Sequence, residues 1–486
     1  MLNKNKKFYI TTSIAYTNAP PHIGFALEAV QADVLARYNR LLGKDVFFLT
    51  GTDEHGIKTL RAARDAGEEP KEFADEISEK FRELNKALNI SNDDFIRTTD
   101  EKIHKPAVEK VWRKLEENDD IYKKKYRGFY CAGCEAFVTE KDLVDGKCPI
   151  HNKKPELIEE ENYFFRLSKY ADRIKKAIES GELKIVPETR KNETLSFINQ
   201  GLEDVSFSRT KDKYWGFEVP GDPSQYLYVW CDALPNYISA IGYYKEDKKF
   251  KKYWPVDVHC LGKDIMRFHT IFWPAMLLSL GLDLPKTIFV HGFITSNGQK
   301  MSKSLGNVVD PFELIEKHGA DALRYYLLRE ISSTEDGDFT YEKFERRYNA
   351  DLAGGIGNLI ARVKVMAEVV DFTKIFPDKK IIDYLTEIKI KYRNSIEDFK
   401  FNEALVCVWD IVHYCDSYIN ETEPWEKNKG YEQVLRNLLE ALFCIGSELL
   451  PPFLPETSEK IEKEIETNKK TGKFKNERGG LLFPRI

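Results

Sequence analysis

The sequence predicts an α/β fold in two separated halves, followed by an all-α region. A strand–helix–strand pattern opens the chain, and buried strands return from Val256 onward. Amphipathic helical periodicity then dominates from Gly355 to near the end of the chain. At 486 residues with 42% hydrophobic content, the chain is too long for one core and has enough apolar material for several.

The first half is expected to begin with a short buried strand over Lys7–Thr12. Gly24 then opens a helix, Gly43 ends it, and Asp45–Thr50 forms a second buried strand. Such a βαβ unit predicts a parallel sheet, with ligands binding at the carboxyl end of the first strand. The apolar residues that recur at helical spacing are Leu27, Val30, Val34, Tyr38, Leu41 and Leu42.

The second half repeats the pattern. We expect a strand at Val256–Leu261, a helix over Asp264–Leu280 despite Pro274, and a strand at Thr287–His291. The segment 118–228 between the halves differs in character and holds clustered cysteines, so it is predicted to be an insertion.

Four amphipathic stretches predict an α-helical bundle after the second half. They cover residues 359–370, 382–399, 402–419 and 431–449.

Cysteine spacing predicts a metal site in the insertion. Two chelating pairs, Cys131-x2-Cys134 and Cys148-x2-His151, supply three thiolates and one imidazole, the ligand set of a closed tetrahedral structural zinc site. The alternative, four unrelated residues, does not account for both spacings. Four other cysteines are expected to be buried small residues rather than disulfide partners: Cys231, Cys260, Cys407 and Cys415.

Two short motifs together indicate a nucleoside triphosphate site. In His22–Phe25 (HIGF), a glycine near a helix start lets phosphates approach the backbone amides. In Lys300–Ser304 (KMSKS), two mobile lysines suit a polyphosphate. Taken singly, the first motif reads as a structural histidine and the second as a solvated basic loop.

This pairing resembles the two signatures of class I aminoacyl-tRNA synthetases, and the rest of the chain narrows the resemblance to the methionyl-tRNA synthetase family. Phe25 departs from the family pattern, which usually has a second histidine there. Further stretches carry the resemblance: Tyr16–Asn18, Gly51–Gly56, Tyr228–Leu234, Gly262–Ile265 with His269, and Asn307–Pro311.

The resemblance implies a set of site residues. Asp53 would pair with the substrate's α-ammonium, and aromatic rings would contact the methionine thioether. The whole methionine pocket would comprise Ser13, Ile14, Tyr16, Asp53, Trp230, Ala233, Tyr237, Ile265 and His269. ATP would contact His22, Gly24, Gly262, Asp264, His291, Lys300 and Lys303, of which His22, Gly24, Lys300 and Lys303 would be catalytic.

Without the resemblance, Trp230 and Tyr237 would be ordinary core aromatics and Asp264 a helix N-cap. In the helical region, Asn358 and Arg362 share one helix face and Trp425 follows a proline at a turn. These three residues match positions that read the anticodon in the family.

We therefore expect a split Rossmann-like parallel-sheet catalytic domain with a zinc-bearing insertion, followed by an all-α helical-bundle anticodon-binding domain. The expected domains are 1–117 (first catalytic half), 118–228 (insertion), 229–328 (second catalytic half), 329–354 (stem-contact connector) and 355–486 (anticodon binding).

The expected reaction is ATP-dependent activation of L-methionine and its transfer to initiator and elongator tRNA(Met), with Mg²⁺ as counter-ion and Zn²⁺ as structural metal. The longest apolar run, Ile271–Leu278, is far short of a membrane span, and the amino terminus lacks a secretory core. A cytoplasmic monomer is expected. With a net charge of −5, tRNA would be bound through local basic patches.

Two other functions stay open on sequence grounds. One is a synthetase for another apolar amino acid. The second is a catalytically impaired paralogue that only binds tRNA, a reading supported by Phe25.

Overall fold

The computed structural model describes residues 6–131, 133, 136–138, 143–149, 152–211, 214–245, 247–301, 306–367, 370, 372, 374–471 and 482–486. The chain divides into two compact units. The sheet unit comprises Met1–Pro21, Gly43–Asn85 and Ser91–His291. The helical unit comprises His22–Leu42, Lys86–Ile90 and Gly292–Ile486.

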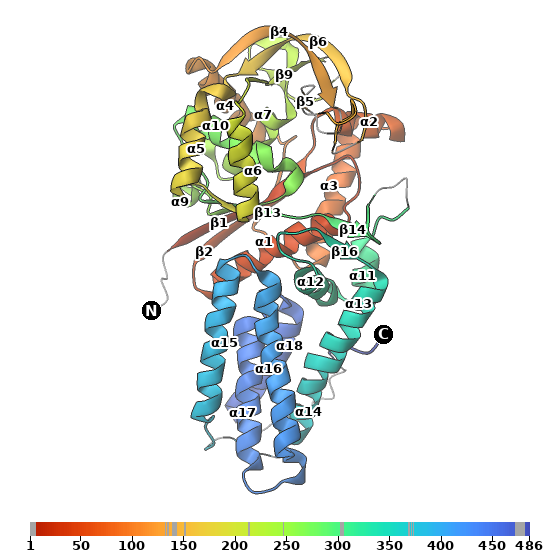
Figure 1. The fold of residues 1–486 in the computed structure, drawn as a ribbon, viewed down its shortest axis with the longest axis vertical. Coiled ribbons are helices and arrows are strands. Elements are labelled where there is room, and N and C mark those ends of the chain that lie inside the picture. The colour runs from red at the N-terminus through yellow and green to blue at the C-terminus, as the bar shows by residue number, and fades with distance from the viewer. Residues whose placement is uncertain are drawn as a thin grey trace. The chain divides into compact units, whose positions relative to one another are not determined.

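A six-stranded parallel sheet forms the centre of the sheet unit (Figure 1). Its order is β3-β2-β1-β12-β13-β7, and every pair of neighbours is parallel. The predicted parallel sheet, built from both halves of the chain, is confirmed. From β1 the chain proceeds outward through β2 on one side and, much later, through β12 on the other. Ligands of open parallel sheets bind at the carboxyl ends of the strands at such a switch point. The strands are β1 Lys7–Tyr16, β2 Asp45–Asp53, β3 Asp94–Arg97, β12 Val258–Gly262, β13 Thr287–His291 and β7 Lys184–Val186.

The strands are buried because their side chains are apolar over most of their length. Tyr9, Leu49, Leu261 and Ile288 are at most 1% exposed and belong to one continuous core. Each such side chain contributes roughly 1.5–3 kcal/mol through removal from water.

The segment 118–228 contributes one strand to the large sheet and several to smaller ones. Edge strand β7 pairs with β13, a contribution that sequence reasoning missed because its three residues show too little periodicity to reveal a strand. A four-stranded sheet has the order β5-β4-β6-β8, and a three-stranded sheet the order β10-β11-β9. These strands are β4 Ile121–Cys131, β5 Ala136–Val138, β6 Glu156–Phe165, β8 Val205–Ser206, β9 Ser208–Thr210, β10 Glu218–Val219 and β11 Asp222–Leu227.

The segment expected to be helical, Asp264–Leu280, is helical throughout, which confirms the prediction. It begins as a 3-10 turn, passes through a π-helical turn and continues as α10, with right-handed helical backbone angles at the junctions. Pro274 directly follows the π-helical turn, so the departure from α-helical hydrogen bonding lies next to the residue that lacks a backbone N–H. The helical elements of this unit are α2 Ile57–Ala66, α3 Pro70–Ala87, α4 His104–Glu117, η2 Leu167–Tyr170, α5 Ala171–Ser180, α6 Glu188–Asn199, α7 Val229–Ala233, α8 Asn236–Ser239, η4 Tyr243–Lys245, α9 Lys248–Tyr253, η5 Lys263–Ile265, η6 Phe268–Phe272 and α10 Trp273–Leu280.

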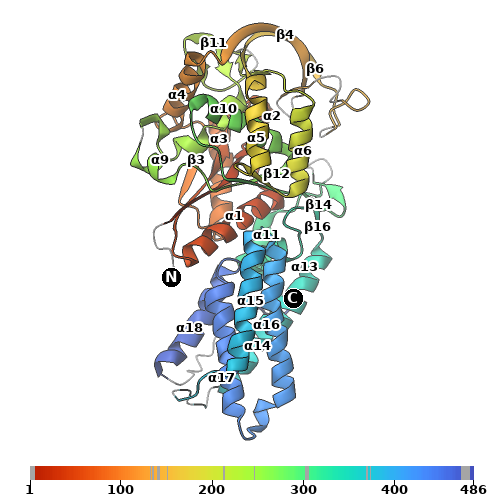
Figure 2. The same ribbon diagram turned by 60° about the vertical axis from the view of Figure 1, so that its left-hand side comes forward.

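The helical unit contains the predicted bundle. Helices α15, α16 and α17 run side by side in both views (Figures 1 and 2), which confirms the expected all-α region. A small sheet, β15-β14-β16, precedes the bundle. The elements are α1 Ile23–Leu41, β14 Ile294–Ser296, β15 Gln299–Lys300, α11 Pro311–His318, α12 Ala320–Arg329, β16 Gly337–Phe339, α13 Tyr341–Arg347, η8 Tyr348–Gly357, α14 Asn358–Ala367, α15 Lys379–Glu397, α16 Phe401–Thr422, η9 Pro424–Glu426, α17 Tyr431–Phe443, η10 Cys444–Leu449 and α18 Pro455–Thr471.

Helix α1 lies between β1 and β2 in the chain but belongs to the helical unit. A salt bridge of 2.8 Å joins Asp33 of α1 to Arg324 of α12, and both side chains are fully buried. Gln31 also donates to the Ser333 carbonyl at 3.3 Å. Among the described residues, no helix is both long enough and apolar enough to cross a membrane.

Candidate active site

The carboxyl ends of β1 and β2 bring two predicted pocket residues together. Tyr16 and Asp53 are paired in the register of the two strands, and Asp53 is only 2% exposed. The register shifts between Thr11 and Ile14, so Ser13 lies in an irregularity of β1. Bulges of this kind re-aim side chains next to active sites. A buried carboxylate at the switch point is well placed to pair with a ligand ammonium.

Aromatic rings from α7, α8 and η6 gather within the same unit. The Trp230 ring stacks on Phe268 with centroids 3.7 Å apart and meets Tyr16 edge-on at 6.2 Å. Tyr237 and His269 lie 5.7 Å apart, and His269 is 6.1 Å from Trp230. Tyr16, Trp230, Tyr237 and His269, expected together from the resemblance, therefore form one cluster. Such rings suit an apolar, polarizable thioether.

Hydrogen bonds fix the orientation of His269. Its Nδ1 donates to the Ile265 carbonyl at 3.0 Å. Its Nε2 shares a hydrogen bond of 2.7 Å with the Tyr237 hydroxyl. The ring is thus held by α8 and η5. Ala233, also predicted for the pocket, is buried at the end of α7.

The ends of β12 and β13 carry the residues expected to contact the nucleotide. Gly262 and His291 are register partners. A Cβ at Gly262 would lie 2.9 Å from Asp264 Oδ1, so any side chain there would crowd the Asp264 carboxylate. Asp264 is exposed and lies inside the 3-10 turn η5, whose N-cap is Gly262. Asp264 is therefore not the N-cap that the structural alternative proposed.

The HIGF motif lies at the start of α1 in the helical unit. His22 is the N-cap, and its Nδ1 accepts from the Gly24 N–H at 3.0 Å. Burial lowers the pKa of His22 to about 4, so the ring is neutral at pH 7 and its Nε2–H remains a donor. The Phe25 ring lies 4.8 Å from the His22 ring.

The first backbone amides of α1 already have partners within the chain. Ile23 N–H donates to the Val309 carbonyl at 3.3 Å, and Phe25 N–H to the His22 carbonyl at 2.9 Å. The Gly24 N–H is engaged as well. The expectation that phosphate approaches these amides therefore gains no support. For a phosphate, His22 Nε2 is the better donor. The bond to Val309 joins the HIGF helix to the segment that follows the KMSKS motif.

The lysines of KMSKS are only partly described. The Lys300 backbone pairs with Thr295 in β15–β14. Lys303 lies outside the described residues, and so does the side chain of Lys300.

The predicted anticodon residues lie in the helical unit. Asn358 is exposed at the start of α14, and Trp425 is 46% exposed in η9. Arg362 donates to Asp416 Oδ1 at 3.3 Å and to Asn420 Oδ1 at 3.2 Å, both on α16. Because the guanidinium has five donors, it keeps further N–H groups for a ligand.

The predicted zinc ligands are half described. Cys131 at the end of β4 and Cys148 are 3% and 2% exposed. The Cys148 carbonyl accepts from Asn152 N–H at 2.8 Å. Cys134 and His151 lie outside the described residues, within which no group of three or more potential ligands is placed to hold a metal.

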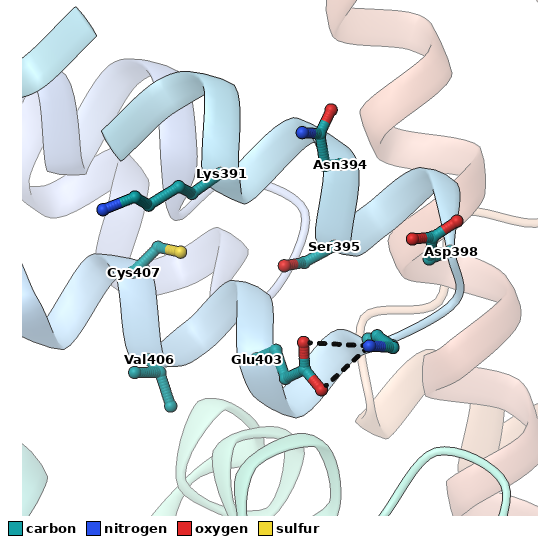
Figure 3. Close-up of a pocket in the computed structure, with 8 residues that line it drawn as sticks. Lys391, Asn394, Ser395, Asp398, Glu403, Val406 and Cys407 are labelled. Carbon is teal, nitrogen blue, oxygen red and sulfur yellow. Dashed lines mark hydrogen bonds and ion pairs between the residues drawn. The ribbon is translucent and has the colours of Figure 1, made fainter. Parts of the chain in front are cut away.

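A separate hollow of about 440 Å³ lies between α15 and α16 (Figure 3). Its charged walls pair with neighbouring residues: Lys400 with Glu403 and Lys391 with Glu387. Burial raises the pKa of the Cys407 thiol, which makes it a poor nucleophile. We assign no function to this hollow.

Sequence reasoning missed three polar residues of the sheet unit. His55, His104 and Asp232 form a buried cluster, with His55 Nδ1 2.6 Å from Asp232 Oδ2. The available signal was the position of His55 two residues after Asp53 and of Asp232 two residues after Trp230. Pairing across 177 residues cannot be read from spacing.

Comparison with known proteins agrees with this geometry. Residues 8–153 and 134–364 match the family described as tRNA synthetases class I (M), and residues 378–477 match the anticodon-binding domain of tRNA ligases. The fold and site therefore define a class I tRNA synthetase. The methionine–tRNA ligase of Caldanaerobacter subterraneus is 47% identical over 99% of this chain and 79% of its own length. That of Thermotoga maritima is 45% identical over 98% and 78%. The chain belongs to the methionine–tRNA ligase family.

A solved structure is similar over the same extent. The Mycobacterium tuberculosis methionyl-tRNA synthetase in complex with methionyl-adenylate has a TM-score of 0.90 and 39% identity, and the match covers 94% of each chain. At 39% identity, the two proteins are similar in amino-acid sequence as well as in fold.

Proposed function

We propose that this chain activates L-methionine with ATP to methionyl-adenylate and transfers the methionyl group to tRNA(Met). The observation that carries the proposal is the buried Asp53 beside the aromatic cluster at the sheet's switch point, in a chain of this family. No covalent enzyme intermediate is needed, because the methionine carboxylate itself attacks the α-phosphate. The protein contributes positioning and electrostatic stabilisation.

The methionine site would combine a residue at the end of β2 with residues of α7 and α8. Asp53 would accept from the α-ammonium, and Trp230 with Tyr237 would surround the thioether. His269, held by the Tyr237 hydroxyl and the Ile265 carbonyl, would line the same pocket. The pocket is completed by Ser13, Ile14, Tyr16, Ala233 and Ile265.

ATP binding would draw on the two motifs and on the strand ends. Neutral His22 would donate from Nε2, and Lys300 and Lys303 would bind the pyrophosphate. Exposed Asp264 would accept from the ribose hydroxyls. Gly24, Gly262 and His291 complete the set. Mg²⁺ would enter with ATP and neutralise phosphate charge.

Transfer RNA would be read by Asn358, Arg362 and Trp425, with both initiator and elongator tRNA(Met) as substrates. The domain boundaries 1–117, 118–228, 229–328, 329–354 and 355–486, a monomeric state and a cytoplasmic location also belong to this proposal.

Methionine-dependent exchange of labelled pyrophosphate into ATP tests the activity. We expect exchange with methionine and almost none with leucine or valine. Equal exchange with leucine would keep the enzyme class and overturn the substrate. Normal tRNA binding without any exchange would establish the tRNA-binding paralogue instead.

Replacing Trp425 by alanine should weaken tRNA charging while sparing adenylate formation. Loss of one base stacked on the indole costs roughly 1–3 kcal/mol. Charging and exchange rates, measured on the same preparations, check this. The matched control is Phe376→Ala, which removes another exposed ring, 78% exposed, from the same unit. Equal losses in exchange and charging would mean that Trp425 is structural.

Zinc fits the described half of its site, since Cys131 and Cys148 are buried thiols at a strand end and a tight turn. When bound by four ligands, zinc would hold the insertion folded. Elemental analysis should find one zinc per chain, and Cys131→Ser should lose it and lower the thermal stability. Cys407→Ser is the control and should retain the metal. A wild-type protein without zinc would contradict the assignment.

A further inference from the structure

A buried polar cluster in the sheet unit is centred on Asp232 of α7. Its side chain is 1% exposed, and its carboxylate lies within ion-pairing distance of two histidines. Oδ2 lies 2.6 Å from His55 Nδ1, and Oδ1 lies 3.3 Å from His104 Nε2. A carboxylate buried away from water needs polar partners, and these imidazoles supply them.

The contacts of His104 connect three helices of the sheet unit. Its Nε2 lies 3.0 Å from the Asp232 carbonyl and 3.3 Å from Asp232 Oδ1, both acceptors on α7. Its Nδ1 lies 2.9 Å from Ser239 Oγ on α8, and the Ser239 hydroxyl also lies 3.1 Å from the Asn236 carbonyl. The ring of His104 is therefore held at both nitrogens.

The electrostatics of Asp232 agree with this arrangement. Burial alone would raise the pKa of its carboxyl, but the charge of His55 and the hydrogen bonds from His104 and His55 outweigh it and hold the pKa below its ordinary value. Asp232 is thus a carboxylate at neutral pH. The apolar packing around it is close, because the Phe217 ring lies 4.6 Å from the His55 ring.

The cluster joins the segments that carry the predicted methionine pocket. His55 follows Asp53 of β2 by two residues. Asp232 lies between Trp230 and Ala233 on α7. His104, the first residue of α4, binds both the Asp232 carbonyl on α7 and Ser239 on α8, the helix that carries Tyr237.

We propose that His55, Asp232 and His104 are positioning residues for methionine. They set the distance between the carboxylate that takes the α-ammonium and the rings that enclose the thioether. This inference rests on the proposed function. Because the cluster holds segments that carry the methionine pocket, its loss should act on methionine binding more than on ATP binding.

The test is Asp232→Asn in the full chain, assayed by methionine-dependent pyrophosphate exchange. A displaced binding group can cost up to about 10²-fold, so we expect the methionine KM to rise roughly tenfold or more while the ATP KM stays within about twofold. Methionine affinity measured separately by isothermal titration calorimetry should fall by the same factor. His55→Asn and His104→Gln each keep one neutral hydrogen bond and should give intermediate rises.

The matched control is Asp120→Asn. Asp120 is another fully buried carboxylate of the sheet unit, bound by Lys169, Tyr170 and Ser279 at 2.5–2.6 Å. The Asp120→Asn variant should be less stable than the wild type, and its methionine KM should be unchanged. If Asp232→Asn only lowers the thermal midpoint, as Asp120→Asn does, the positioning role is refuted.

Should Asp232→Asn fail to fold, His55→Asn and His104→Gln decide the matter by the same KM ratio. Unchanged methionine KM in both folded variants would overturn the proposal. A wild-type chain without any methionine-dependent exchange would instead refute the proposed function.

Discussion

Replacing Lys303 by alanine should slow methionine-dependent pyrophosphate exchange by roughly 10²–10³-fold, the usual cost of removing one preorganised charge that stabilises a transition state. Negative charge builds on the leaving pyrophosphate as the methionine carboxylate attacks, so the lysine acts more strongly in the transition state than on bound substrates. The methionine KM should therefore change little. Steady-state exchange kinetics with both substrates varied separate the two effects.

Lys317→Ala provides the control for this variant. Lys317 is an exposed lysine in the last turn of α11, a short distance along the chain from the motif. Its loss removes the same charge from the helical unit and should leave the exchange rate unchanged. A Lys303 variant that raises only KM would mean that the lysine binds substrates without stabilising the transition state.

The strands and helices predicted most accurately are those whose residues share one environment, such as full burial, along the whole element. The strand Thr287–His291 was predicted with the bounds it has in the structure, because four of its five residues are buried. The helical segment expected over Asp264–Leu280 is also present. Its 3-10 and π-helical turns were not foreseen, because helical spacing alone does not distinguish them from α-helical turns.

Most features that the sequence did not reveal depend on contacts between residues that lie far apart in the chain. The edge strand β7 is recognisable only from its partner β13, which lies about a hundred residues further along the chain. The engagement of the Ile23 amide by Val309 depends on a contact that no local pattern encodes. The resemblance indicated Asp53 and Trp230. It did not indicate the cluster of His55, Asp232 and His104, whose members are far apart in the chain.

Arg324 is a fully buried cation that joins several segments of the helical unit. Its guanidinium is fully buried, pairs with Asp33 at 2.8 Å, and donates to the carbonyls of Leu88, Pro452 and Phe453 at 2.7–3.1 Å. A single side chain thus connects α1, the segment after α3, α12 and the turn before α18. Its charge is compensated by Asp33, which also binds Arg37 at 2.7 Å.

We expect Arg324→Met to lower the free energy of unfolding of the helical unit by about 3–5 kcal/mol, because removing one partner of a buried pair leaves the other charge and several carbonyls unsatisfied. Methionine fills a similar volume, so the loss reports polar contacts rather than a cavity. Denaturant unfolding followed by far-ultraviolet circular dichroism measures it. Arg393→Ala is the control, since the Arg393–Glu397 pair is 65% and 52% exposed and such solvent-screened pairs contribute little to stability. Asp33→Asn combined with Arg324→Met should destabilise less than the sum of the two changes, because each already removes the same ion pair. Equal unfolding midpoints for the Arg324 and Arg393 variants would show that the buried contacts do not stabilise this unit.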